Sequence, residues 1–72
     1  MPSLPAIEAQ LRRPPSHWNE RILADLRTAW AQLEADGVQP TPARLRAILG
    51  RGPTGWNASI LSCLDDAFTA AG

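Results

Sequence analysis

Hydrophobic residues recur at helical spacing along most of the chain, and no segment alternates between apolar and polar residues as a strand does. The longest such segment is predicted to be a helix from His17 to Asp36, with Ser16 as its N-cap and Gly37 as a left-handed C-cap. Its apolar positions form one stripe that needs a partner surface: Trp18, Ile22, Leu23, Leu26, Ala29, Trp30 and Leu33.

Two further helices are predicted after Gly37. Thr41 followed by Pro42 has the order of an N-cap and a first helical residue, so a short helix is expected from Thr41 to Leu49, closed by Gly50. Thr54 can cap a last helix that extends nearly to the C-terminus. The apolar stripe of that last helix comprises Trp56, Ile60, Leu61, Leu64, Ala67 and Phe68.

A proline-bounded segment precedes the long helix. Residues Ala6 to Arg13 can form two helical turns with Ser3 as the N-cap, and Pro14-Pro15 stop them because proline cannot continue a helix. We therefore expect residues 1–14 to be an N-terminal helical arm or docking segment and residues 15–72 to be a helix-turn-helix-like helical domain. The expected fold class is all-α, a small helical domain of three to four helices containing a helix-turn-helix.

Length and composition predict one small hydrophobic core that no disulfide bond or structural metal ion stabilises. The chain has 72 residues, one cysteine and one histidine, so neither an internal disulfide nor a zinc set is expected, and no cofactor is predicted. The sequence places no residue where it could orient His17 as a general base. The adjacent Asp65 and Asp66 would point about 100° apart on a helix and could not act on one substrate, so we expect no enzyme activity. No apolar run is long enough for a membrane span, and no secretory leader is evident, so a cytoplasmic location is expected.

The charges are balanced overall but unevenly distributed. Seven arginines match seven acidic residues, and a net charge of zero is unusual for a nucleic-acid-binding domain. Residues 37–55 nevertheless carry three arginines and no acid, whereas residues 1–36 carry four arginines against five acids and residues 56–72 carry two acids alone. If the protein binds a polyanion, the middle of the chain is where we expect the contact.

A helix-turn-helix in this basic stretch predicts a specific interface with double-stranded DNA. The helix from Thr41 to Leu49 would cross the DNA backbone, and the N-terminus of the last helix would enter the major groove. The predicted DNA-binding residues are Arg44, Arg46, Arg51, Thr54, Gly55, Asn57 and Ser59. Asp65 and Asp66 would face the groove further along, so only the first turn of the last helix could approach DNA without repulsion. The alternative is that Gly50-Arg51-Gly52 simply joins two packed helices of a bundle.

From Glu20 to Phe68 the chain resembles the N-terminal DNA-binding region of the KfrA-like plasmid proteins. The resemblance rests on a long helix ending at Gly37, then Pro40-Thr41, then Leu45-Arg46, then Leu49-Gly50-Arg51-Gly52. It implies a helix-turn-helix or winged-helix-like domain that binds DNA as a dimer and represses transcription on a plasmid or phage. The chain departs from the family after the glycine turn, where Pro53-Thr54-Gly55-Trp56-Asn57 replaces a run of the type serine-proline-asparagine-threonine, so base specificity does not carry over.

Two functions are therefore expected from the sequence. The first is a DNA-binding domain or small transcriptional regulator of plasmid or phage type, with a homodimer as one arrangement. The second is a small inhibitor or adaptor that binds a host protein through the N-terminal segment and the long helix. Zero net charge and the acidic last helix motivate the second function, because neither opposes a protein contact.

Overall fold

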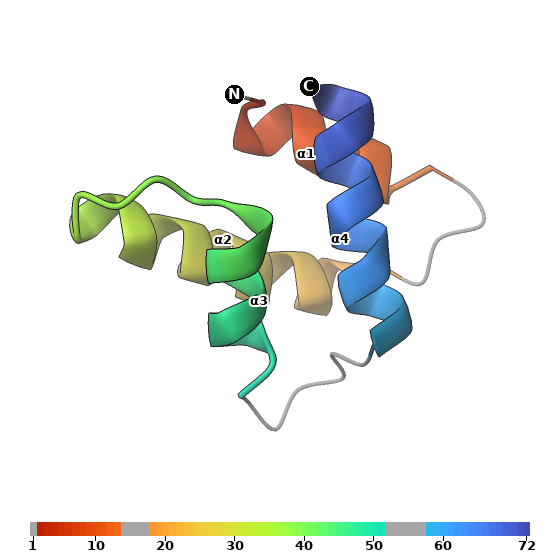
Figure 1. The fold of residues 1–72 in the computed structure, drawn as a ribbon. Coiled ribbons are helices and arrows are strands. Elements are labelled where there is room, and N and C mark those ends of the chain that lie inside the picture. Colours follow the sequence, from red (N-terminus) through yellow and green to blue (C-terminus); the bar gives the residue numbers. More distant parts are fainter. Residues whose placement is uncertain (1, 14–17, 52–57) are drawn as a thin grey trace.

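Helices account for all the regular structure in the part of the chain that the computed structural model describes, which is residues 2–13, 18–51 and 58–72 (Figure 1). Their order is α1 (Leu4–Leu11), α2 (Glu20–Ala35), α3 (Pro42–Leu49) and α4 (Ala58–Ala71). These residues contain no strand, so the prediction of a small all-α domain of three to four helices is confirmed.

Ser3 sets the start of α1. Its hydroxyl accepts a hydrogen bond from the Ala6 amide at 3.4 Å, and proline follows in the first turn, where its missing N–H costs nothing. The predicted cap is therefore confirmed. The helix spans Leu4–Leu11 rather than the predicted Ala6 to Arg13, because a cap at residue 3 starts the helix at the next residue.

Asn19, and not Ser16, is the N-cap of α2. Its side-chain oxygen accepts a hydrogen bond from the Ile22 amide at 3.0 Å, and the helix begins at Glu20. The predicted start at His17 is wrong, because asparagine caps as well as serine does and here stands directly before an acid that favours the first turn. Ser16 and His17 themselves lie outside the described residues.

Gly37 ends α2 in the predicted way. Its φ of 72° lies in the left-handed region, which glycine adopts without a side-chain clash. The Val38 amide then donates to the Leu33 carbonyl at 2.9 Å, and the Gly37 amide donates to the Glu34 carbonyl at 3.0 Å. These two bonds satisfy carbonyl groups that the helix end would otherwise leave open and turn the chain back toward α3.

The start of α3 follows the sequence prediction. Thr41 caps α3 as predicted, since its hydroxyl accepts from the Arg44 amide at 3.3 Å and Pro42 is the first helical residue. The described part of α4 begins at Ala58. The residues predicted to start that helix, Thr54 and Trp56, lie outside the described residues.

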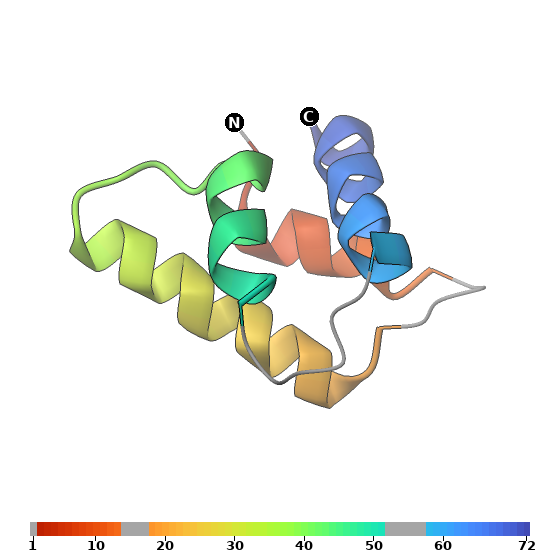
Figure 2. The ribbon, with the colours of Figure 1, turned by 60° about the horizontal axis from the view of Figure 1, so that its bottom comes forward.

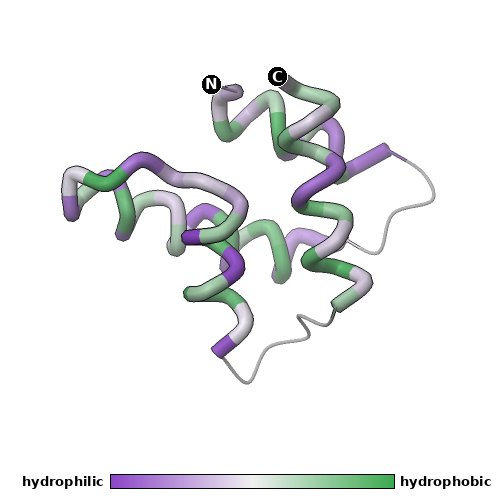
Figure 3. The backbone as a smooth tube through the Cα atoms, viewed as in Figure 1, coloured by the Kyte–Doolittle hydropathy of each residue, from purple (hydrophilic) through white to green (hydrophobic). Residues whose placement is uncertain are grey.

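The helices enclose one hydrophobic core. Helix α1 packs against α4, and α3 packs across α2 at a steep angle, as both views of the ribbon show (Figures 1 and 2). In Figure 3 hydrophobic and hydrophilic residues interleave along every helix, as expected where only one side of each helix faces a core. The whole stripe predicted for the long helix is buried: Trp18, Ile22, Leu23, Leu26, Ala29, Trp30 and Leu33.

The N-terminal helix contributes to that same core. Ile7 and Leu11 on α1 are 0% and 3% exposed, and both belong to the cluster formed by α2, α3 and α4. Leu4 packs against the edge of this cluster. The most buried apolar residues of α1 are therefore packed within the chain, while Pro5 and Ala9 are exposed and Leu4 is half-buried.

Replacing Ile7 with alanine tests whether α1 is an integral part of the fold. A fully buried isoleucine truncated to alanine loses apolar burial and leaves a cavity, which costs about 2–5 kcal/mol in the free energy of unfolding. Urea denaturation followed by far-ultraviolet circular dichroism measures this loss. The exposed Ala9→Ser on the same helix is the control and is expected to change the free energy by less than about 0.5 kcal/mol. Equal effects of the two substitutions would contradict the packing of α1.

A charged network joins α1 to the start of α2. Glu8 is buried, and its Oε1 accepts from Arg27 Nε at 2.8 Å and lies 2.5 Å from Arg27 Nη2. Arg12 pairs with Glu20 at 2.8 Å and approaches Glu8 at 4.0 Å. The hydrogen bond to Glu8 raises the pKa of Arg27 above its usual range. The pairing of Arg27 with Glu8 therefore stabilises the fold fully below the ordinary arginine pKa. This stabilisation is lost only as the pH rises through the raised pKa of Arg27, far above neutrality.

We expect Arg27→Met to lower the unfolding midpoint, because Glu8 would keep only its longer contact with Arg12 while remaining buried. Arg21→Met removes the same charge from an exposed position on the same helix and is the control. Thermal unfolding of both variants, at neutral and mildly alkaline pH, measures the difference. Equal midpoints would show that the pairing of Glu8 with Arg27 does not stabilise the fold.

Candidate nucleic-acid interface

Helix α3 carries the first two predicted DNA-binding arginines on different sides. Arg44 and Arg46 are two positions apart, which separates their directions by about 200° around a helix. Both side chains are exposed. Leu45 between them is fully buried, and this anchors α3 with its polar sides outward.

Arg44 projects from the first turn of α3 and contacts the connection from α2. Its Nη1 donates to the backbone carbonyl of Gln39 at 2.8 Å. That partner is neutral, so the guanidinium keeps its full charge while its stem is held near the turn. No carboxylate pairs with Arg44 among residues 2–13, 18–51 and 58–72.

Arg46 points the other way and forms an ion pair with Asp65 on α4. The side chains of Arg46 and Asp65 are 46% and 43% exposed, so water still reaches both groups. This pair joins the two helices that the sequence predicts to form the helix-turn-helix. It also neutralises one of the three positive charges in the basic stretch.

Arg51 lies just beyond the C-cap of α3 and is exposed. It follows Arg44 by seven residues, which is close to two helical turns, and Gly50 between them keeps right-handed helical angles. The amide of Arg51 donates to the Ile48 carbonyl at 3.4 Å and so continues the helical turn. A helical turn continued through Gly50 would place Arg44 and Arg51 on similar sides of α3, and no described acid forms an ion pair with either.

The exposed side of α4 is polar near its start and acidic further along. Ser59 in the first described turn is exposed, as are Ser62 and Asp66, while Asp65 is half-buried beside α3. This order agrees with the expectation that only the first turn could approach a polyanion without repulsion. The remaining predicted base contacts, Thr54, Gly55 and Asn57, lie outside the described residues, as does Gly52 of the predicted glycine turn, so the helix-turn-helix stays a prediction.

Sequence reasoning missed the pairing of Arg46 with Asp65. The two residues are 19 positions apart, so no local spacing rule links them. Only the packing of α3 against α4 brings them together. The sequence held a weaker indication of this pair, because Asp65 and Asp66 are the first acids after the basic residues 37–55, which contain none.

The described residues offer neither a metal-binding cluster nor a helix that could cross a membrane. They contain no group of three or more histidine, cysteine, aspartate or glutamate side chains placed to hold a metal ion. None of the helices formed by these residues combines the length and the apolar character that crossing a bilayer requires. No family model, curated protein or solved structure was found to match the chain.

A double-mutant cycle on Arg46→Ala and Asp65→Ala tests the link between α3 and α4. Since both side chains are more than a third exposed, we expect a coupling free energy below about 1 kcal/mol that declines as salt is added. Chemical denaturation of the two single variants and the double variant gives this value. A cycle that pairs Arg44→Ala with Asp65→Ala should show no coupling. Equal coupling in both cycles would contradict a specific pair.

Proposed function

We propose that the chain is a small DNA-binding domain that contacts the backbone of double-stranded DNA through Arg44 and Arg51. One observation carries the proposal. These two arginines are exposed, seven residues apart on α3 and the turn that follows it, and neither is neutralised by a described acid. Arginine is well suited to phosphate because its planar guanidinium can donate two hydrogen bonds at once.

Arg46 has a different part in this proposal. Its pairing with Asp65 holds α3 against α4 and fixes the direction of the arginine-bearing side, instead of contacting phosphate directly. Ser59 would lie nearest the DNA on α4, and Asp66 would remain outside the groove because its charge is repelled by phosphate. The expected contact is therefore narrow and consists mainly of phosphate interactions.

The finer role that we propose is transcriptional regulation of the plasmid or phage type. Its support is the resemblance of residues 20–68 to the N-terminal region of KfrA-like proteins, which implies binding as a dimer. Two copies would double the number of phosphate contacts, which a narrow interface needs for useful affinity. In this proposal the protein binds and does not catalyse.

The alternative function, a protein-binding adaptor, has to use different surfaces from those first expected. The apolar faces of α1 and α2 form the core, so a host protein would meet only their exposed sides. A pocket between the start of α1 and the second half of α2 is open on those sides, but it is small compared with the surface that a stable protein complex buries. We therefore place DNA binding first.

Fluorescence anisotropy with a short random-sequence duplex at several salt concentrations tests the proposal. Each phosphate-contacting arginine that is removed should lower the slope of log affinity against log salt by about one unit, so Arg44→Ala with Arg51→Ala should lower it by about two. The control is Arg13→Ala with Arg21→Ala, which removes the same charge from exposed positions around the junction of α1 and α2. Equal losses in both double variants, or no binding by the unmodified chain, would refute the assignment.

A further inference from the structure

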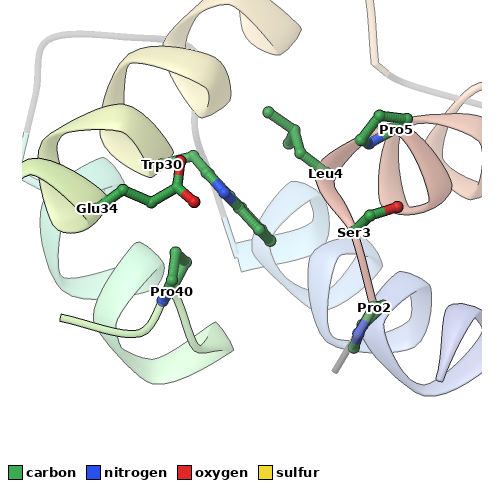
Figure 4. Close-up of a pocket in the computed structure, with 7 residues that line it drawn as sticks. All are labelled: Pro2, Ser3, Leu4, Pro5, Trp30, Glu34 and Pro40. Atoms are coloured by element: carbon green, nitrogen blue, oxygen red, sulfur yellow. The ribbon is translucent and has the colours of Figure 1, made fainter. Parts of the chain in front are cut away.

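A pocket of about 430 Å³ opens between the start of α1, the second half of α2 and the connection to α3 (Figure 4). It lies apart from the arginines of α3 in sequence and uses a different set of side chains. Those that line it are Pro2, Ser3, Leu4, Pro5, Trp30, Glu34 and Pro40. Its volume falls within the range of about 300–1,000 Å³ that accommodates small ligands.

The walls of the pocket are apolar and largely fixed. Three of the seven lining residues are prolines, whose rings restrict the backbone and remove side-chain freedom. The ring of Trp30 stacks on Phe68 of α4, with ring centroids 6.1 Å apart and planes inclined by 24°. A pocket whose walls are already ordered loses little conformational entropy when it is filled.

Among the described residues that line the pocket, Glu34 alone carries a charge. It is exposed, its carboxylate makes no ion pair with another described residue, and it lies in the last turn of α2. The carbonyl groups at that end of a helix are partially negative, so an unpaired carboxylate there is unfavourable until a cation arrives. The start of α1 offers little to an anion, because Ser3 already accepts from the Ala6 amide and Pro5 has no N–H.

We propose that this pocket holds the side chain of a lysine or arginine from a partner polypeptide. The aliphatic stem would pack against Leu4 and Trp30, and the cationic end would reach the carboxylate of Glu34. The volume exceeds what one alkylammonium group needs, and the proline rings on both sides leave room for the residues that flank a basic residue in a peptide. This site is independent of the proposed DNA-binding function.

Capped tripeptides with a central lysine, arginine, norleucine or glutamate test the proposal by NMR titration of the full chain labelled with nitrogen-15. Lysine and arginine peptides should shift the amide signals of Leu4 and Glu34 and the indole signal of Trp30. Norleucine preserves the stem without the charge and should bind several-fold more weakly, and the glutamate peptide should not bind. Free butylammonium should bind more weakly than the lysine peptide, because it lacks the flanking residues.

Glu34→Gln should weaken binding of the lysine peptide by about three- to fivefold, as expected for an ion pair exposed to water. Asp36→Asn removes an exposed acid two positions further on, outside the pocket, and should leave the affinity unchanged. The proposal is overturned if both variants bind equally, or if norleucine or free butylammonium binds as well as lysine. It is also overturned if the same signals shift with protein concentration alone, because a second copy of the chain would then fill the pocket.

Discussion

The apolar stripe of α2 is the constraint on which the rest of the structure depends. Seven apolar residues lie along this helix and just before it, and all are buried although the described residues form only three other helices to cover them. Helix α3 packs across α2, while Trp30 reaches α4 by stacking on Phe68. Removing any one covering helix would expose part of the stripe to water, which is why α1 belongs to the core and is not a loosely attached arm.

The burial of one face of every helix also decides where the charges can act. Arginines and acids share the remaining surface, and much of the acidic charge is taken up by arginines on neighbouring helices, as in Glu8 with Arg27 and Asp65 with Arg46. A net charge of zero therefore does not mean an evenly neutral surface. Arg44, Arg51 and Glu34 form no ion pair with a described residue, and these are the charges that our two proposals assign to phosphate and to a basic side chain.

Local rules predicted the helices and several of their caps. Ser3, Thr41 and Gly37 act as the sequence indicates, because capping and left-handed turns depend on a few neighbouring residues. The start of α2 was wrong because two capping residues, Ser16 and Asn19, stand close together and the sequence pattern alone does not rank them. The pairing of Arg46 with Asp65 and the pocket beside Trp30 could not be predicted, since both arise from helices that are distant in sequence and meet only when the core forms.

The two ends of the described chain lie next to each other in both ribbon views, with Pro2 beside Gly72 (Figures 1 and 2). In the view of Figure 1 the C-terminal end of α3 lies on the opposite side of the molecule. Such a unit tolerates insertion into a surface loop of a host domain, because a short spacer at each junction is enough to span the gap. A fluorescent reporter fused at either terminus would sit close to the proline-lined pocket and leave the arginine-bearing end unobstructed.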